Sequence, residues 1–182
     1  MPQDSNPSTP TSFEIVVAAD LNNGIGIDGD LPWKLPGDMR FFKELTLGAG
    51  HNVVIMGRKT WQSIPDRFRP LSGRINIVLS RQQLELPTGV LLADSLHAAL
   101  DLCQSLPSID RVFVIGGGQI YAEALTHPSC SRVFLTRVMD QFPCDAFLPG
   151  LDRDWQSVAC GETQTESSIA YRFETLERST ES

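Results

Sequence analysis

One stretch, from Gly24 to Leu45, constrains the fold more than any other, because it joins a glycine- and proline-rich loop to an amphipathic helix. Three glycines open the loop, and the pairs Leu31-Pro32 and Leu35-Pro36 close it. Each proline disfavours helical backbone in the residue before it, so we expect the helix to begin at Pro36. The pattern therefore predicts an extended loop directly above the first turn of a helix.

Asp38 lies on the apolar face of this expected helix. The spacing i, i+3, i+4 and i+7 aligns it with Phe41, Phe42 and Leu45. A carboxylate in such a place is unfavourable unless something binds to it. One interpretation is a buried carboxylate, its pKa raised by desolvation, that binds a protonated or amidine-like heterocycle. The other is an ordinary acidic residue in a first turn, where the helix dipole favours negative charge. The helix alone favours the second interpretation.

The composition is that of one globular domain with a negatively charged surface. The 182 residues are 41% hydrophobic and carry a formal net charge of −7, which argues against nucleic acid or an anionic membrane as partner. No apolar run approaches the roughly 20 residues of a membrane span. Residues 1–12 lack the basic and apolar regions of a secretory signal. We therefore expect a cytoplasmic protein with a disordered leader over residues 1–12. Nothing in the sequence encodes the oligomeric state, and a monomer is the default expectation.

The four cysteines and three histidines do not have the spacing of metal ligands. The cysteines are far apart and form no CxxC pair; they are Cys103, Cys130, Cys144 and Cys160. We predict no metal site and four buried free thiols in a reducing compartment.

Short apolar runs alternate with helical patterns along the chain. Six strands are expected at Phe13–Ala19, Asn52–Met56, Ile75–Leu79, Val90–Leu92, Val112–Ile115 and Arg132–Val138. Helical segments are expected around Trp61–Ile64, after an N-cap at Ser95, and after a triple glycine. The alternation predicts an α/β fold with a mostly parallel sheet and helices on both faces. Trp155–Cys160 and Tyr171–Leu176 have no helix between them and predict an antiparallel edge.

The triple glycine Gly116–Gly118 ends an apolar strand and leads directly into a helix. Backbone N–H groups at such a turn can approach a phosphate without interference from a Cβ atom. The run is not GxGxxG and lacks the acidic residue of the Rossmann fingerprint. A plain tight turn between strand and helix is an equally good interpretation of these residues alone.

Two basic groups follow strands of the expected sheet. Arg58-Lys59-Thr60 follows the second strand, and Ser80-Arg81 follows the third. Ligands of α/β folds bind at the carboxyl ends of parallel strands, so the two groups together predict an anion site able to select a 2′-phosphate. Arg74 could bind a carboxylate through two parallel hydrogen bonds. Either basic group taken alone is better explained as solvated surface charge, and Arg74 could equally be an exposed loop arginine.

Together these segments resemble dihydrofolate reductase. The family's motifs occur in order: GIG and DLPW in the opening loop, a helix carboxylate, VIMGRKTWQSIP, RPLSGRINIVLSR, VFVIGGGQIY and FLTRVM. The aspartate at position 38 is typical of bacterial members, whereas the loop PDRFRPLSGR resembles vertebrate members. The resemblance implies a single domain over residues 13–178 with a tail at 179–182. It implies a three-layer sandwich in which about four helices flank an eight-stranded, mostly parallel sheet with an antiparallel C-terminal edge.

The resemblance implies NADPH-dependent reduction of dihydrofolate to tetrahydrofolate, inhibition by antifolates, and roles for particular residues. Asp38 would bind the pterin, Thr136 would support it, Trp33 would hold an ordered water, and Leu31 would lie over the nicotinamide. Arg74 would pair with the α-carboxylate of the glutamate tail. The remaining residues implied at the substrate site are Val17, Ala18, Met39, Phe42, Ile64, Leu71, Ile115 and Tyr121.

The resemblance also implies a cofactor site made of residues from five segments of the chain. Its expected members are Ala19, Ile25, Gly26, Gly57, Arg58, Lys59, Thr60, Leu79, Ser80, Arg81, Gly116, Gly117, Gly118, Gln119, Ile120 and Tyr121. The peptide between Gly116 and Gly117 is expected to be cis, as in the family. Two alternatives stay open: a reductase of the same fold acting on another pterin or a ribosylaminopyrimidine, and a catalytically silent folate-binding protein.

Overall fold

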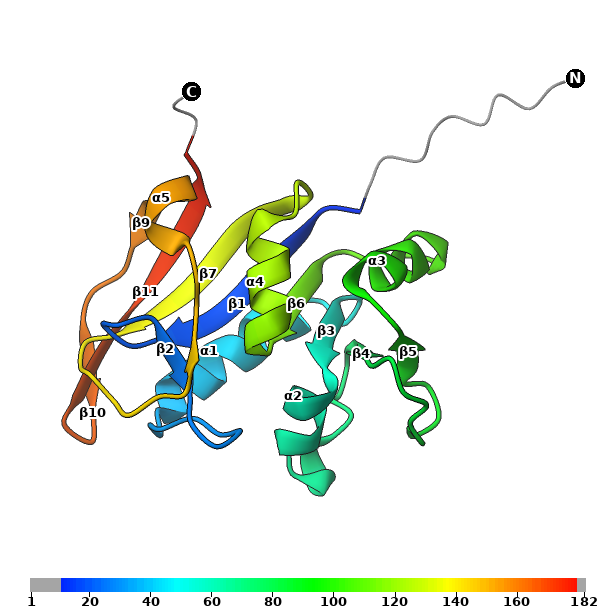
Figure 1. Ribbon diagram of the computed structural model, residues 1–182, viewed down its shortest axis with the longest axis horizontal. Coiled ribbons are helices and arrows are strands. Elements are labelled where there is room, and N and C mark those ends of the chain that lie inside the picture. The colour runs from blue at the N-terminus through cyan, green and yellow to red at the C-terminus, as the bar shows by residue number, and fades with distance from the viewer. Residues whose placement is uncertain (1–10, 180–182) are drawn as a thin grey trace, which may run out of the picture.

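The computed structural model describes residues 11–179. The predicted leader falls outside the described residues up to position 10, as does the tail from position 180. Eight strands follow one another across the main sheet in the order β10-β11-β7-β1-β6-β3-β4-β5, and β9 also pairs with β11 (Figure 1). The strands are β1 (Phe13–Ala19), β3 (Val53–Gly57), β4 (Ile75–Leu79), β5 (Leu91–Ala93), β6 (Val112–Gly116), β7 (Cys130–Val138), β9 (Trp155–Cys160), β10 (Gln164–Glu166) and β11 (Ile169–Arg178).

The sheet is parallel from β7 to β5 and antiparallel at the C-terminal edge. The pairs β1–β7, β1–β6, β3–β6, β3–β4 and β4–β5 are all parallel. Strand β11 pairs antiparallel with β7, β9 and β10. The predicted mostly parallel sheet with an antiparallel edge is therefore confirmed. It follows from buried runs such as VVIM and INIVL, which suit strands covered on both faces.

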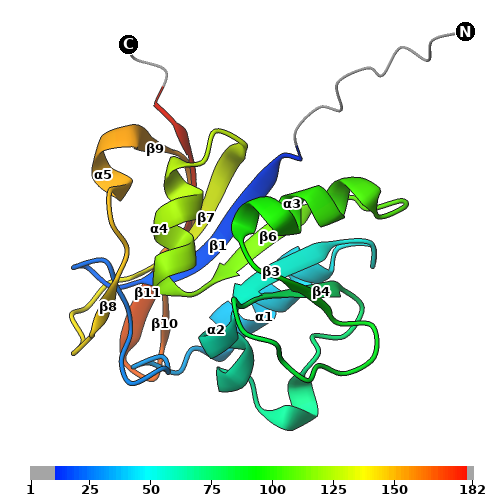
Figure 2. The same cartoon turned by 45° about the vertical axis from the view of Figure 1, so that its right-hand side comes forward.

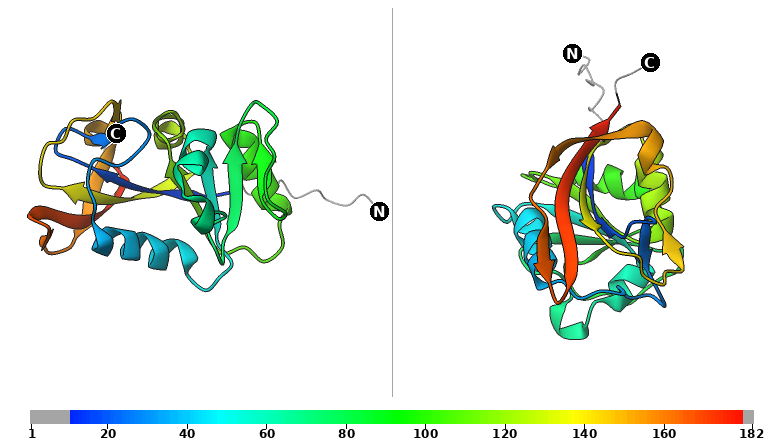
Figure 3. Two further views of the ribbon diagram at one scale, coloured as in Figure 1. Left: turned by 90° about the horizontal axis from the view of Figure 1, so that it is seen from below. Right: turned by 90° about the vertical axis from the view of Figure 1, so that its left-hand side faces the viewer.

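Four helices of six or more residues form the outer layers: α1 (Pro36–Leu47), α2 (Arg58–Ser63), α3 (Leu96–Ser105) and α4 (Gly118–Thr126). Helix α1 lies on one face of the sheet, while α3 and α4 lie on the other (Figures 2 and 3). Helix α2 packs on the α1 side, because Trp61 shares a hydrophobic cluster with Phe42 and Leu45. The three-layer architecture is thus confirmed.

Alternation along β1 divides the core between these two faces. Ile15, Val17 and Ala19 belong to the larger cluster, which includes side chains of α3 and α4. Val16 belongs to the cluster beneath α1 and α2. Side chains of successive strand residues point to opposite faces, so Ala18 lies on the α1 side, where it packs against a third cluster that contains Trp33.

Several element boundaries agree with those predicted from the sequence, and others differ from them. Helix α1 begins at Pro36, and the Ser95 side chain caps α3 by accepting a hydrogen bond from the Ala98 N–H. Helix α2 begins at Arg58, directly after β3, and is longer at its start than the expected turn. The sequence did not reveal strands β2 (Gly24–Gly26), β8 (Ala146–Phe147) and β10, the 3-10 helix Asp66–Phe68, or the short helix α5 (Leu151–Asp154).

The four cysteines are free thiols, but only two of them are buried. Cys103 and Cys130 are buried, whereas Cys144 is half-buried and Cys160 is exposed on β9. The prediction of four buried thiols is therefore wrong for the last two, because both lie in the outer C-terminal part of the fold. Within residues 11–179, no group of His, Cys, Asp and Glu could hold a metal ion. That same part of the chain has no helix of the length and hydrophobicity needed to cross a membrane.

Candidate active site

Asp38 and Thr136 form a buried pair between α1 and β7. Asp38 is 9% exposed and Thr136 is 3% exposed. The Thr136 hydroxyl donates a hydrogen bond of 2.6 Å to Asp38 Oδ1. Burial is the largest influence on this carboxyl and raises its pKa; the hydrogen bond from Thr136 lowers the pKa, and the charge of Glu166 raises it. A carboxyl so placed suits the exchange of a proton with a bound base.

Trp33 is buried in a cluster that also contains Val138, two positions after Thr136 on β7. Its side chain packs with Leu35, Val138 and Tyr171, and its ring meets Phe142 edge to face. Its indole N–H is buried and has no hydrogen-bond partner within the described residues. A buried donor of this kind needs a ligand or a water as acceptor. This observation fits the expected role of Trp33 in holding an ordered water.

Apolar side chains predicted for the substrate site lie around the same face. Phe42, Ile64, Leu71 and Ile115 are all partly buried and pack against the cluster beneath α1 and α2. Ala18 packs against the Trp33 cluster. Two further predicted residues are exposed, Met39 to 57% on α1 and Leu31 to 42% in the opening loop. Together these residues provide an apolar wall with two large side chains open to solvent.

Arg74 is held in position by two neighbours. Its Nη1 donates to Thr46 Oγ1 at 2.9 Å, and its Nε donates to the Ser72 carbonyl at 3.0 Å. Burial lowers the pKa of the guanidinium from its usual value. The Asn76 side chain fixes the preceding turn through hydrogen bonds to Leu71 and to the Arg74 carbonyl. Arg74 is therefore an oriented cation and not a freely moving surface side chain.

The opening loop is an ordered ribbon. Strand β2 pairs with β8, and Ile27 and Asp30 exchange two backbone hydrogen bonds of 2.9 Å around the Asp28-Gly29 turn. Both turn residues have positive φ, as expected for Asp-Gly in a two-residue hairpin. Asp145, in the loop before β8, accepts the Asp28 N–H at 3.0 Å through its Oδ2. We call residues 24–31 the lid; they end two positions before Trp33.

Asp20, a residue that the sequence analysis missed, anchors the start of the lid. It is fully buried, and its carboxylate accepts the N–H groups of Asn22, Gly24 and Phe142 at 2.8–2.9 Å. A Cβ atom on Gly24 would lie 2.5 Å from the Cys144 sulfur, so only glycine allows this close approach. The Asn-Asn-Gly turn after β1 was the available sequence signal, because an aspartate before such a turn commonly accepts backbone N–H groups.

The predicted cofactor segments meet at the carboxyl ends of β3 and β6. Gly116 and Gly117 are joined by a cis peptide, as predicted. A Cβ atom on Gly116 would lie 2.8 Å from Thr60 Oγ1, and one on Gly117 would lie 3.2 Å from it. The corresponding positions on Gly57 and Gly118 contact Ile120 and Ile25. The glycines thus form a bare cradle of backbone that brings the lid, α2 and α4 together.

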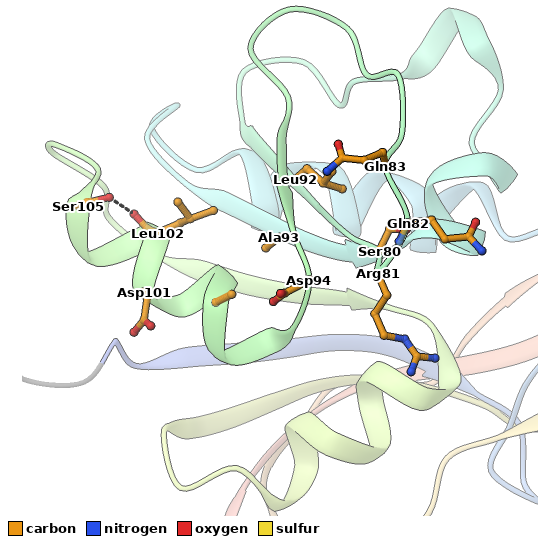
Figure 4. A pocket seen from close by; sticks show the side chains of 11 residues that line it. Ser80, Arg81, Gln82, Gln83, Leu92, Ala93, Asp94, Asp101, Leu102 and Ser105 are labelled. Carbon is orange, nitrogen blue, oxygen red and sulfur yellow. Dashed lines mark hydrogen bonds between the residues drawn. The ribbon is translucent and has the colours of Figure 1, made fainter.

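The two predicted basic groups also adjoin one another. Arg58 Nη1 donates to Gln82 Oε1 at 2.8 Å, which links the start of α2 to the segment after β4. Ser80, Arg81 and Gln82 line an open groove of about 600 Å³ that continues past Asp94 toward α3 (Figure 4). Lys59 and Gln119 are exposed nearby in sequence at the starts of α2 and α4. The two basic groups that the sequence singled out therefore lie next to each other in the fold.

Four predicted site residues have side chains in the core. Val17, Ala19, Leu79 and Tyr121 all belong to the cluster beneath α3 and α4. The Tyr121 hydroxyl donates to the Val16 carbonyl at 2.7 Å. Burial and the charge of Asp38 both raise the pKa of this phenol, so it stays protonated. For Val17, Ala19 and Leu79, contact with a ligand at the strand ends would have to come from the backbone.

Comparison with known proteins identifies the family. Residues 12–178 match the family described as dihydrofolate reductase. The dihydrofolate reductase of Rattus norvegicus is 42% identical over 178 residues, which cover 90% of this chain and 95% of the rat protein. That of Drosophila melanogaster is 36% identical over 177 residues, covering 91% of this chain and 97% of the insect protein.

Plant relatives are longer. The bifunctional dihydrofolate reductase-thymidylate synthase of Glycine max is 42% identical over 186 residues, and the match covers 94% of this chain but 34% of the plant protein. The chain therefore spans about a third of the length of the bifunctional proteins that it matches. The matched residues contain the Asp38–Thr136 pair, the lid and the glycine cradle. The chain belongs to the dihydrofolate reductase family.

Proposed function

We propose that the chain catalyses the NADPH-dependent reduction of dihydrofolate to tetrahydrofolate. The buried pair of Asp38 and Thr136 carries this proposal. Within the described residues, Thr136 is the one hydrogen-bond donor to the carboxylate, so Oδ2 is left for a ligand. An amidine edge of a pterin, with a ring N–H beside an exocyclic amine, presents donors that match a carboxylate. Family membership supports the same substrate.

NADPH fits the residues of the glycine cradle. A Cβ atom on Gly116 or Gly117 would crowd Thr60, so glycine lets the backbone approach closely here, and backbone N–H groups at such a turn can bind pyrophosphate oxygens. Arg58, Ser80 and Arg81 offer charge-assisted donors for a 2′-phosphate on an otherwise acidic protein. The cofactor would supply a hydride from nicotinamide C4 to pterin C6. The groove lined by Arg81 and Gln82 would take the adenosine end.

The protein's own groups orient the pterin and handle a proton. Asp38 would hold the ring, and its negative charge would raise the basicity of N5. Trp33 would hold, through its unpartnered indole N–H, the water that carries the proton to N5. Thr136 would keep the carboxylate in one orientation. The lid, bound to Asp145 and β8, would exclude bulk water from the nicotinamide side.

At the far end of the substrate, Arg74 would bind the α-carboxylate of the glutamate tail. The two hydrogen bonds that orient Arg74 leave Nη2 and one N–H of Nη1 for a carboxylate. The apolar wall of Phe42, Ile64 and Leu71 lies between the two polar ends and suits an aminobenzoyl ring. Antifolates with a diaminopyrimidine or diaminopteridine head would compete for Asp38.

A spectrophotometric assay tests the proposal: NADPH oxidation is followed with and without dihydrofolate. We expect oxidation that depends on dihydrofolate and is blocked by methotrexate. A reductase of the same fold acting on another pterin or a ribosylaminopyrimidine would oxidise NADPH only with that substrate. A silent folate-binding protein would bind methotrexate and oxidise no NADPH. Either result would refute the proposal.

A further inference from the structure

Glu166 joins two parts of the fold that are far apart in sequence. It ends β10, and its Oε1 accepts the Gly37 N–H at 2.8 Å, across 129 positions of the chain. The same oxygen accepts a hydrogen bond from the Tyr171 hydroxyl on β11. The hairpin of β10 and β11 consequently lies against the start of α1 (Figure 3). Gly37 directly precedes Asp38.

Glu166 supplies the first turn of α1 with a contact that the local sequence lacks. The N-cap residue is Leu35, which has no side-chain acceptor, and Pro36 at N1 has no N–H. The orphaned N–H of Gly37 is therefore bonded by a carboxylate from a distant hairpin. Glycine is required at position 37, because a Cβ atom there would collide with both Glu166 Oε1 and the Tyr171 hydroxyl. The first turn is thus fixed against the hairpin at the residue before Asp38.

Tyr171 makes this contact rigid. It is 1% exposed and packs with Trp33 and Leu35. Burial, followed by the hydrogen bond to Glu166, raises the pKa of Tyr171 to about 12, so the phenol remains a donor. Trp33 and Glu166 are therefore connected through one buried aromatic side chain.

The polar and titratable groups that bear on Asp38, directly or through Tyr171, come from five elements. Thr136 of β7 donates to it, and the phenols of Tyr121 on α4 and Tyr171 on β11 lie within reach of its charge. Glu166 on β10 is the carboxylate whose charge acts on Asp38. Arg40 on α1 acts on Tyr171 in the opposite sense. Glu166 is therefore the negative neighbour that opposes ionisation of Asp38.

We propose that Glu166 is a positioning residue for the Asp38 site: its carboxylate, held by the Gly37 N–H and the Tyr171 hydroxyl, fixes the first turn of α1 at the residue before Asp38 and sets a negative charge there. Where turnover is measured, this role of Glu166 rests on the proposed function. It adds to the site a second carboxylate, which would act through Gly37 and Asp38.

The variant Glu166→Gln removes the charge but keeps the hydrogen bonds, because the side-chain oxygen of glutamine can still accept from the Gly37 N–H and the Tyr171 hydroxyl. On the alkaline side of the pH profile, kcat/KM for dihydrofolate falls to half its maximum at a particular pH. We expect this pH to be lower in Glu166→Gln than in the unmodified protein. On that side kcat/KM should drop roughly two- to fivefold relative to the unmodified protein, a fraction of one pKa unit. On the acid side of the profile, kcat/KM should stay unchanged. The matched control is Glu162→Gln, an exposed glutamate of the segment before β10, which should leave the profile unchanged.

A second measurement keeps the proposal independent of turnover. The Asp38 carboxyl is titrated by NMR in protein labelled at aspartate carboxyls, with Asp38→Asn to assign the signal. Glu166→Gln should lower the midpoint, and a midpoint unchanged from that of Glu162→Gln would overturn the proposal. If the unmodified protein fails to reduce dihydrofolate, the proposed function fails while this titration still decides the role of Glu166. Glu166→Ala should, in addition, raise KM for dihydrofolate, because the first turn of α1 loses its anchor.

Discussion

Thr136 on β7 donates a 2.6 Å hydrogen bond to Asp38 on α1, across 98 positions of sequence. The pairing exists because β7 lies beside β1 at the centre of the sheet, so the end of β7 reaches the first turn of the helix that follows the lid. The hydroxyl stabilises the ionised form of the carboxyl, whereas burial and Glu166 oppose that form. Replacements at these positions should therefore move the titration of Asp38 in opposite directions.

Thr136→Val removes the donor while keeping the shape of the side chain. The pKa of Asp38 should rise further, so the alkaline limb of kcat/KM should move to higher pH, opposite to Glu166→Gln. Loss of the partner of a buried acceptor should lower the free energy of unfolding by about 1–3 kcal/mol. The measurements are a pH profile and urea unfolding, with the exposed Thr165→Val as control. An alkaline limb that moves to lower pH in Thr136→Val would contradict the prediction that the hydroxyl lowers the pKa of Asp38.

Asp38→Asn removes the charge and keeps an acceptor for Thr136. We expect nearly normal NADPH binding and a loss of turnover of roughly 10²- to 10⁴-fold at neutral pH, the range typical of a proton-handling group. The control is the exposed Asp110→Asn. Fluorescence titration with NADPH and steady-state kinetics check the two halves of the prediction. Turnover close to that of the unmodified protein would remove Asp38 from the chemistry.

The same variant should be more stable than the unmodified protein at neutral pH. The folded-state pKa of Asp38 is raised above its ordinary value of 3.8, so folding disfavours the ionised form. This destabilisation is absent below the unfolded pKa, where both states are protonated, and grows as the pH rises through the unfolded and then the folded pKa. The unfolding midpoint of Asp38→Asn should therefore exceed that of the unmodified protein at neutral pH. In acid well below 3.8 the difference should vanish.

The sheet and the meeting of the cofactor segments were predictable from sequence because both depend on local patterns. Runs such as INIVL specify buried strands, and Gly116–Gly118 marks where one of them ends. Asp38 was found because its spacing placed a charge on an apolar helix face. Glu166 carried no such signal: a glutamate in a hairpin is ordinary, and its contact with Gly37 depends on tertiary packing. Strand β2 was missed for the same reason, since three residues pair only because β8 lies beside them.

Asp145→Ala should loosen the lid without unfolding the protein. The carboxylate is exposed and accepts the Asp28 N–H, so its removal frees the tip of the lid while the backbone bond from Asp145 N–H to Gly26 remains. We expect a free energy of unfolding within about 0.5 kcal/mol of the unmodified value, because exposed sites rarely change it more. Turnover and NADPH affinity should both fall. Asp140→Ala in the same loop is the control, and an unchanged kcat would show that the lid does not need this anchor.

Arg58 and Arg81 should together determine the preference for NADPH over NADH. Both lie beside Gln82, which bonds Arg58 directly, and both would meet a 2′-phosphate that NADH lacks. Charge-assisted hydrogen bonds contribute about 1.5–3 kcal/mol each, so Arg58→Ala with Arg81→Ala should reduce kcat/KM for NADPH by roughly 10²-fold or more. Since the lost contacts involve only the phosphate, kcat/KM for NADH should change little, and kcat at saturating NADPH should be largely retained. Arg153→Ala on α5, an exposed arginine outside both basic groups, controls for the loss of positive charge. Equal use of NADPH and NADH by the unmodified protein would exclude a 2′-phosphate site at these arginines.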